Sequence, residues 1–293
     1  KYVNQTSAEW EWYVDHIGRW ADFKNAYKTW DRDYMESVMW VFKQMYDKGF
    51  IYKGLRVGLY CPHCATPISS FEVALDNSYK EVPDSATTYK YKLLDEENTY
   101  ILAWSTTPWN KIVTPALAVN PKLKYIKVKQ SDEYYILAKS AIKMLKNEPK
   151  FQIIEEFKGE DLIGRKFEPH YDYYKIKPGE KAFEIIGGDF ITAEEGTGIV
   201  TIAVYGIEDL AAMQENNMHI EQHLDDEGNI LPNVPKFGGM FYLKANKAVN
   251  QDLSSRHLIY RDENLPHKVP VCWRCETRLY YAPLDAWFVD IQK

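Results

Sequence analysis

The residues with the clearest chemistry are four cysteines, which form two Cys-x-x-Cys pairs at Cys61–Cys64 and Cys272–Cys275. A gap of two residues lets both thiolates of one turn reach the same ion, and two such turns complete the tetrahedral site that zinc prefers. The alternatives are free buried cysteines or a redox pair, although a redox pair requires only one such motif. We therefore expect a structural zinc ion, with His63 outside its ligand set, bound by Cys61, Cys64, Cys272 and Cys275.

The two cysteine pairs are separated by residues 65–271, far more than the spacing within an ordinary zinc ribbon. This separation is typical of a domain inserted between the two turns of one ribbon. A bound metal would then close the base of the inserted domain, and it would offset the loop-closure entropy that opposes docking.

Two polar motifs within this long stretch could take part in catalysis. Ser105, Thr106 and Thr107 place three hydroxyls on one turn, and each hydroxyl can both donate and accept hydrogen bonds. Asp209 lies near the start of a helical pattern, where the helix dipole favours a carboxylate. On residue types alone, a β-turn and a helix N-terminus are the simpler interpretations of these two motifs.

One helix is strongly predicted near the start of the chain. Asp31 or Asp33 can cap its N-terminus, and Lys48 followed by Gly49 is typical of a helix end. The apolar positions between these residues recur at helical spacing, at Tyr34, Val38, Val41, Phe42 and Met45.

From about residue 77 the pattern changes to short runs of β-branched and aromatic residues separated by turn-forming residues. Helical stretches interrupt these runs at Ser140–Lys146 and Ile207–Asn217. The pattern predicts a mostly β unit over about 77–266. The predicted strands are Tyr89–Leu93, Tyr100–Trp104, Tyr125–Val128, Tyr134–Ala138, Phe151–Glu155, Phe183–Gly187 and Gly198–Ala203.

The overall composition is that of a folded protein. Of the 293 residues, 45% are apolar and 27% are charged, which is too hydrophobic for a disordered chain. No apolar run is long enough to cross a membrane, and the net charge of −6 excludes one continuous basic surface without excluding nucleic acid. The chain begins with Lys1 rather than Met and no signal sequence follows, so we expect a piece of a longer protein. With only four cysteines, which do not form a disulfide scaffold, we expect that protein to be cytoplasmic.

Several longer motifs together point to a known family. The most specific lie toward the two ends of the chain: Ile17–Thr29, Tyr34–Val38, Val41–Gln44, Tyr60–Pro62, Phe71–Ala74, Cys272–Cys275 and Trp287–Val289. Two more lie in the middle: Trp104–Trp109 followed by Ala118–Pro121, and Gly196–Val200 followed by Gly206–Asp209. The outer motifs resemble isoleucyl-tRNA synthetases of class I, and the middle pair resembles the two signatures of the family's editing domain.

The resemblance implies an α+β architecture. A mostly β, barrel-like editing domain would be inserted into a zinc-ribbon and helical base that flanks a class I Rossmann catalytic core. Residues 1–76 would hold the helical segment and the first half of the base, 77–266 the editing domain, and 267–293 the second half of the base and the return to the core. ATP and magnesium would serve only the full-length parent, so this piece would not aminoacylate tRNA alone.

The function implied by the resemblance is hydrolysis of mischarged Val-tRNA(Ile) by attack of water on the aminoacyl ester. Thr106, Thr107 and Asp209 would be catalytic, with Asp209 pairing with the free α-amino group of the amino acid. The expected partners are the valine-charged 3′ end of tRNA(Ile) and the rest of the synthetase, in a monomer with no membrane contact. Further substrate contacts would come from Ser105, Trp109, Gly196, Gly198 and Thr201.

Departures from the usual sequence of the family's motifs leave a second interpretation open. Thr201 stands where the family has histidine, and Val204 stands where it has proline. One residue is also missing before Asp209, and Asn110-Lys111 replaces the usual Thr-Leu. The alternative is therefore an eroded, non-catalytic editing domain that only positions the tRNA 3′ end or supports the parent synthetase.

Overall fold

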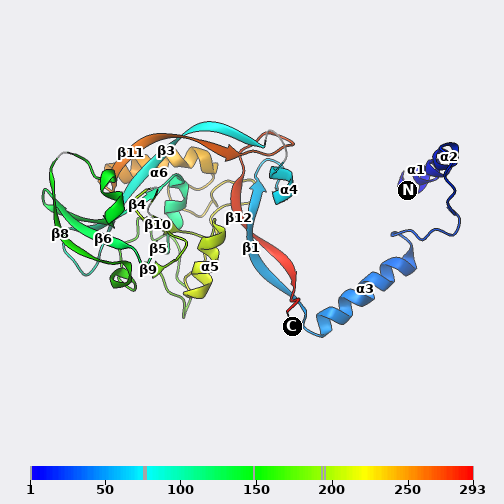
Figure 1. Cartoon of the computed structure of the whole chain (residues 1–293), viewed down its shortest axis with the longest axis horizontal. Helices are drawn as coiled ribbons and strands as arrows, with labels where there is room; N and C mark the ends of the chain where they lie inside the picture. Colours follow the sequence, from blue (N-terminus) through cyan, green and yellow to red (C-terminus); the bar gives the residue numbers. More distant parts are fainter. Residues whose placement is uncertain (1, 75–77, 148, 193, 195, 293) are drawn as a thin grey trace. The chain divides into compact units, whose positions relative to one another are not determined.

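The computed structural model describes residues 2–74, 78–147, 149–192, 194 and 196–292, and the chain divides into two compact units. The first unit combines residues 1–54 with residues 285–293, and the second spans residues 55–284. Figure 1 shows the elements along the chain. The boundary predicted at 76/77 lies outside the described residues, and the one predicted at 266/267 falls within a continuous strand.

The first unit contains three helices, α1 (Tyr2–Ser7), α2 (Glu9–His16) and α3 (Arg32–Asp47). The helix predicted near the start of the chain is confirmed as α3, with Asp31 at its N-cap position and Lys48 at its C-cap position. Gly49 follows with a φ of 72°, the left-handed conformation in which many helices end. None of the described helices is both long and apolar enough to cross a membrane.

Aromatic side chains hold the first unit together at one end of α3. Trp287 packs edge-on against Phe42, with 6.0 Å between the ring centroids, and also against Tyr46. Tyr52 stacks on Phe288 with a centroid separation of 5.5 Å. Even so, α3 contains no buried residue, so its apolar side chains remain largely uncovered within this unit.

A small sheet lies next to the cysteine pairs. It has the strand order β12-β1-β2, with bounds β12 (Tyr280–Val289), β1 (Ile51–Cys61) and β2 (Thr66–Ile68). Helix α4 (Ser70–Val73) follows β2 and begins with a capping box, in which Ser69 and Glu72 each bond the other's backbone N–H. Sequence analysis did not predict these strands.

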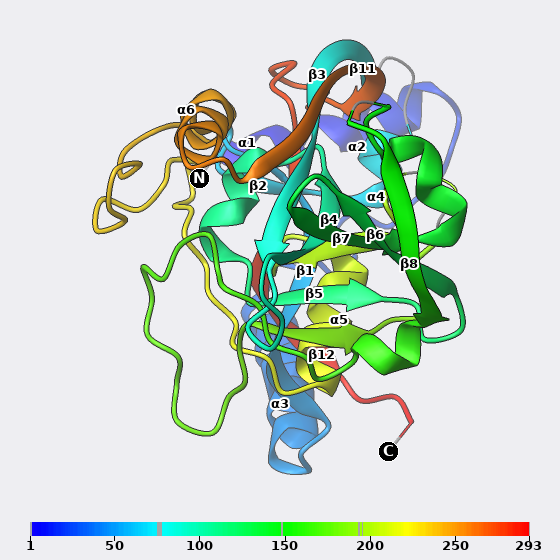
Figure 2. The same ribbon diagram turned by 90° about the vertical axis from the view of Figure 1, so that its left-hand side faces the viewer.

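The second unit is built on a large mixed sheet with the strand order β8-β6-β7-β4-β10-β5-β9 and with β3 paired to both β4 and β11. Figure 2 views this sheet from one end of the unit, where the strands curl rather than lie flat. The strands are β3 (Tyr79–Lys92), β4 (Thr99–Ser105), β5 (Ala116–Val119), β6 (Lys124–Gln130), β7 (Glu133–Ala138), β8 (Phe151–Lys158), β9 (Glu184–Gly187), β10 (Ile199–Ile202) and β11 (Ile259–Pro270).

Helices cover parts of this sheet. The longer ones are α5 (Ile207–Glu215) and α6 (Tyr242–Ser255), and the 3-10 helices are η1 (Pro108–Val113), η2 (Lys139–Met144) and η3 (Gly159–Leu162). Tyr89, Tyr91 and Tyr125 are fully buried in the core of this unit. Each predicted strand is confirmed, and the predicted helical stretches correspond to η2 and α5. The mostly β fold class is therefore confirmed, whereas α6, β5 and β11 were missed.

Candidate functional site

The hydroxyl motif lies at the carboxyl end of β4, where the strand turns into η1. Ser105 Oγ accepts a hydrogen bond from the backbone N–H of Thr107 at 3.2 Å and lies 3.1 Å from Thr107 Oγ1. Asn110 Nδ2 also donates to Thr107 Oγ1, at 3.3 Å. Pro108 is the first residue of η1, where it needs no N–H partner. The turn is therefore held by its own side chains as well as by its backbone.

Thr106, the middle residue of this motif, faces a cleft of about 630 Å³ within the second unit. Residues of α6 form one side of the cleft, and the paired strands β3 and β11 contribute to the other. Arg278 forms an ion pair with Asp84 at 2.7 Å, and Asp262 accepts hydrogen bonds from Ser85 and Thr87. Lys247 adds a further cation to the lining. The cleft is thus open and lined by both polar and apolar groups, with Thr106 of the predicted site on its wall.

The glycine motif precedes β10 and sets this strand against β4. Gly196 and Gly198 have φ values of 66° and 71°, a backbone conformation that residues other than glycine rarely adopt. A Cβ on Gly196 would lie 3.0 Å from the side chain of Trp104. Tyr125 OH donates to the Gly198 carbonyl at 2.8 Å, and Val200 pairs in parallel with Trp104. The main role of these two glycines is therefore to allow the backbone conformation that leads into β10.

Asp209 is the third residue of α5 and lies in the first turn of that helix, just after β10. Its carboxylate accepts a hydrogen bond from the backbone N–H of Ala203 at 3.2 Å, which fixes the turn that connects the strand to the helix. Because β4 and β10 are parallel, their carboxyl ends lie at the same edge of the sheet. The turn at Ser105–Thr107 and the start of α5, which carries Asp209, therefore both lie at this edge of the sheet.

The structure adds a residue to this region that was not in the predicted site. Lys111, on η1, is only 1% exposed, and its amine donates a hydrogen bond to Thr201 Oγ1. No ion pair joins Lys111 to Asp209 in the described part of the chain, but the two groups interact electrostatically. The only sequence signal was that Asn110-Lys111 departs from the family's wording, as Thr201 also does.

The pKa values of Lys111 and Asp209 are both shifted so that the neutral form of each group is favoured. Burial lowers the pKa of Lys111 to about 7, although the charge of Asp209 partly opposes this. Burial likewise raises the pKa of Asp209 to about 6, against the hydrogen bond from Ala203 and the charge of Lys111. Burial therefore brings the pKa values of the amine and the carboxyl group close to each other, because it disfavours the charged form of both.

The remaining predicted site residue, Trp109, lies in the core. It is 3% exposed, and its ring packs edge-on against Tyr205 and Tyr242 at centroid distances of 4.7 and 5.6 Å. Its backbone N–H donates to Asn246 Oδ1 at 3.1 Å, which ties η1 to α6. Trp109 therefore anchors η1, which follows the hydroxyl turn, in the core. It does not line the cleft with Thr106.

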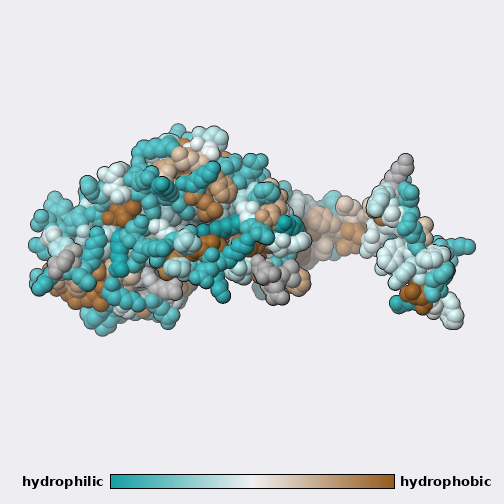
Figure 3. All heavy atoms as spheres, turned by 90° about the horizontal axis from the view of Figure 1, so that it is seen from above, coloured by the Kyte–Doolittle hydropathy of each residue, from teal (hydrophilic) through white to brown (hydrophobic). Residues whose placement is uncertain are grey.

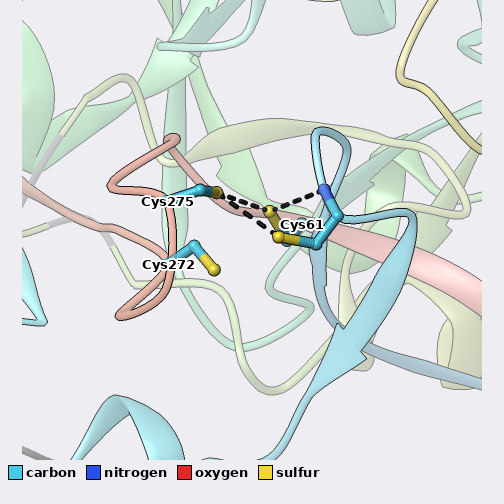
Figure 4. A group of neighbouring side chains, drawn as sticks. Cys61, Cys272 and Cys275 are labelled. Carbon is cyan, nitrogen blue, oxygen red and sulfur yellow. Dashed lines mark hydrogen bonds between the residues drawn. The ribbon is translucent and has the colours of Figure 1, made fainter.

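The four cysteines come together as the sequence predicts (Figure 4). Their sulfur atoms all lie within 4.8 Å of one another, and Cys275 Sγ is 3.5 Å from the sulfurs of both Cys61 and Cys64. Zn–S bonds of about 2.3 Å in a tetrahedron imply sulfur separations of roughly 3.8 Å, so this set fits a zinc ion. Each pair is followed by a residue at positive φ, Ala65 at 47° and Glu276 at 60°.

The two cysteine turns are also joined by side chains outside the sulfur cluster. Glu72 of α4 accepts hydrogen bonds from Trp273 Nε1 at 2.8 Å and from Arg274 Nη2 at 3.1 Å. Lys80 forms an ion pair with Glu276 at 2.5 Å. Segments from the two ends of the second unit are therefore already held together at the point where a metal would bind.

Comparison with known proteins agrees with these observations. A family described as tRNA synthetases class I (I, L, M and V) matches residues 1–293, the whole chain. The chain belongs to the class I tRNA synthetases. This confirms the family that the motifs of both ends and of the middle indicated.

Individual synthetases give the same result. The chain is 40% identical to the isoleucine–tRNA ligase of Clostridium tetani over 284 residues and 35% identical to that of Chlamydia trachomatis over 297 residues. These matches cover 97% and 100% of this chain but only 27% and 28% of the relatives. The chain thus spans little more than a quarter of the length of these ligases.

The matches among solved structures include leucyl-tRNA synthetase domains. The P. falciparum cytosolic leucyl-tRNA synthetase editing domain is 10% identical, with a TM-score of 0.48, and the match covers 60% of this synthetase chain and 98% of that domain. The structure titled GlLeuRS-CP1 is 14% identical, also with a TM-score of 0.48, and covers 61% and 98% respectively.

Proposed function

We propose that this chain is the editing region of an isoleucyl-tRNA synthetase and that it hydrolyses the ester of Val-tRNA(Ile). The observation that supports this most strongly is the parallel pairing of β4 and β10. It brings the hydroxyl turn at Ser105–Thr107 and the turn of Asp209 to one edge of the sheet, although about a hundred residues separate them in sequence.

A separate hydrolytic site has a clear energetic purpose. A pocket gains only about 1–3 kcal/mol from one additional methylene, and the isoleucine–valine pair in this enzyme family is itself the standard example of that limit. A second site that is too small for isoleucine can admit valine and remove it from the tRNA. Valine would then be selected against twice, because it binds the first site more weakly than isoleucine and because it alone fits the second site and is hydrolysed there.

In the proposed reaction, Asp209 binds the α-ammonium of the amino acid, and the hydroxyls of Thr106 and Thr107 orient the ester and the attacking water. Water adds to the ester carbonyl, the bond from the carbonyl carbon to the ribose oxygen breaks, and free valine leaves. The ribose oxygen takes up a proton and becomes the tRNA hydroxyl again. Ser105 and Thr201 would shape the pocket, while Gly196, Gly198 and Trp109 would hold its backbone in place.

The wider assignments rest on the same family membership. Zinc is the proposed metal for the four cysteines, where it would tie the two ends of the editing domain together. The 3′ end of tRNA(Ile) and the rest of the synthetase are the proposed partners, in a cytoplasmic monomer. ATP and magnesium would act only in the full-length ligase.

One observation favours a second candidate, the non-catalytic editing domain. Thr201 Oγ1, at the position where the family has histidine, already accepts a hydrogen bond from Lys111. A site filled by its own lysine could hold the tRNA end without hydrolysing the ester. This candidate predicts binding of the tRNA end with no loss of the aminoacyl bond.

The purified chain distinguishes the two candidates when it is incubated with Val-tRNA(Ile) and with Ile-tRNA(Ile) in separate reactions. We expect the valine ester to be lost at least tenfold faster than the isoleucine ester. Thr106→Ala should slow this loss without changing the melting temperature, since its side chain is only partly buried. Thr107→Ala should slow it as well and lower the melting temperature slightly, because its hydroxyl also bonds Ser105 and Asn110. If neither ester is hydrolysed but the tRNA end still binds, the non-catalytic candidate is correct.

A further inference from the structure

The carboxylate of Glu72 connects the two cysteine turns, although it lies outside the four-cysteine cluster. One of its oxygens, Oε2, accepts hydrogen bonds from the backbone N–H and from the hydroxyl of Ser69, both at 2.9 Å. The other oxygen, Oε1, accepts from Trp273 Nε1 at 2.8 Å and from Arg274 Nη2 at 3.1 Å. A carboxylate offers about four lone-pair positions, so these donors use its full capacity.

On the side of the first cysteine turn, local structure fixes the position of Glu72. Strand β2 pairs antiparallel with β1, whose last residue is Cys61. Ser69 follows β2 and caps α4, and Glu72 completes the capping box. Ile68 packs with Cys61 in a small apolar cluster that is separate from the main core. The carboxylate is therefore held in place relative to the turn that carries Cys61 and Cys64.

On the side of the second cysteine turn, both residues that donate to Glu72 lie between the two cysteines. Trp273 and Arg274 are the middle residues of the pair Cys272–Cys275. The guanidinium of Arg274 also lies over the ring of Trp273, 4.8 Å from its centroid, so the two side chains meet the carboxylate together. Because each of them is flanked directly by a cysteine, a displacement of these residues also displaces the sulfur atoms of this pair.

We propose that Glu72 is a positioning residue for the zinc ion, because its carboxylate holds the second cysteine turn against the first before the metal binds. The proposal rests on the proposed zinc site and is independent of ester hydrolysis. Residues 65–271 separate the two turns, so ordering a free second turn would cost part of the free energy of metal binding. Loss of a group that orients metal ligands from outside typically weakens metal binding by about 10- to 100-fold.

A second contact at the same turn differs from this one and provides a control. Lys80 forms an ion pair with Glu276, the residue after Cys275, but these side chains are 50% and 75% exposed. Exposed ion pairs contribute little to stability, because water screens them and both side chains lose conformational freedom. The side chain of Glu72 is only 22% exposed, and its hydrogen bonds come from two directions. We therefore expect the contact through Glu72 to be the stronger of the two.

Two substitutions break the contact from opposite sides. In Glu72→Gln the amide oxygen can still complete the capping box with Ser69, because glutamine also serves at this position. The NH2 group of the new side chain then faces the N–H donors of the second turn, where it cannot accept a hydrogen bond. Trp273→Phe keeps an aromatic ring and removes the indole N–H. Glu276→Gln makes the same chemical change as Glu72→Gln at the exposed ion pair, and it is the matched control.

The indole N–H signal of Trp273 in the NMR spectrum tests whether the turns are held together before the metal binds. In the metal-free wild type, the hydrogen bond to the carboxylate should move this signal downfield of an unbonded indole, and Glu72→Gln should reverse the shift. Circular dichroism of each metal-free chain shows that it is folded. A signal that does not respond to Glu72→Gln would overturn the proposal, because the contact would then be absent without metal.

Competition with a chromophoric chelator at pH 7 measures the zinc dissociation constant of each chain. We expect Glu72→Gln and Trp273→Phe each to weaken zinc binding by about 10- to 100-fold, and the double variant to bind about as weakly as the weaker single variant, because both remove one contact. Glu276→Gln should change the affinity by less than about threefold. If wild type binds no zinc, the proposed zinc site fails together with this role of Glu72. If wild type binds zinc and Glu72→Gln binds it equally well, or no worse than Glu276→Gln, only the role of Glu72 is overturned.

Discussion

In residues 55–284 the side chains of Tyr89 and Tyr91 are fully buried, whereas in the other unit Trp20 is 95% exposed and Trp12 and Trp40 are each 64% exposed. Both units are rich in aromatic residues, and only their surroundings differ. In the second unit the aromatics lie between the curled sheet and its helices. In the first unit α3 has no buried residue, and apolar colour follows its surface in Figure 3.

This contrast separates a unit that completes its own core from one that does not. Burial of a large apolar side chain contributes about 1.5–3 kcal/mol, so exposed tryptophans in a folded protein indicate a surface that another part covers. The chain spans little more than a quarter of its ligase relatives. Within the described residues, the apolar side chains of α3 therefore lack a cover, whereas the second unit buries its own aromatic residues.

The largest effect should come from the cysteine cluster, because it closes the second unit at its base. Cys272→Ser, or removal of metal by a chelator, should lower the free energy of unfolding by about 5 kcal/mol, since a link from Cys64 to Cys272 closes a loop of roughly 200 residues. Denaturant unfolding and metal analysis measure this, with His63→Ala as a control that should change neither. If metal analysis finds no zinc and a chelator leaves the free energy of unfolding unchanged, the cysteine cluster is not a zinc site.

Two tryptophan substitutions test the contrast itself. Trp109→Ala should cost about 3–5 kcal/mol, because it empties a buried site in the aromatic core. Trp40→Ala on exposed α3 should change the unfolding of the second unit by less than about 0.5 kcal/mol. Denaturant unfolding of both variants gives the comparison. Similar losses in the free energy of unfolding at the two positions would contradict the view that only the second unit has its own aromatic core.

A smaller effect, of opposite sign, is expected at Lys111. Its pKa falls from the ordinary 10.5 to about 7 on folding, so the unfolded chain binds more protons than the folded chain between these values, and wild-type stability rises with pH across this window. Lys111→Met should therefore raise the free energy of unfolding by about 3 kcal/mol at pH 7, and this gain should fade toward pH 10.

Thermal or denaturant unfolding at several pH values measures the effect, with Lys143→Met on exposed η2 as the matched control. A gain that is the same at pH 7 and pH 10 would mean that the lysine is not charged and buried in the way described. A loss of stability at both pH values would mean that its hydrogen bond to Thr201 outweighs the cost of burial.

The sequence was informative wherever the signal is local. The strands around Ile101 and Ile136 alternate or cluster β-branched and aromatic residues, and both were predicted. The ribbon of β3 and β11 was largely missed because its outer half is polar and places Pro83 opposite Pro266, and proline argues against a strand. This ribbon is stabilised by the pairing of β3 with β11, and the local sequence of either strand does not encode that pairing.

Two misses have different causes. Helix α6 carries a readable signal, because its buried residues Tyr242, Ala245, Val249 and Leu253 recur at helical spacing among polar neighbours. Lys111 carries no such signal as a site residue, since a lysine in a short turn is ordinarily exposed. Only the packing of η1 against β3 and β10 buries it, and that packing depends on contacts distant in sequence.

The central claim is that Asp209 recognises the α-ammonium of the amino acid, and one comparison tests it most directly. Hydrolysis rates are measured for Val-tRNA(Ile) and for N-acetyl-Val-tRNA(Ile), which lacks this charge, with wild type and with Asp209→Ala. Wild type should prefer the free amine by about 10- to 100-fold, the value of a charge-assisted hydrogen bond, and Asp209→Ala should lose this preference with its fold intact. A preference that survives in Asp209→Ala would contradict the account.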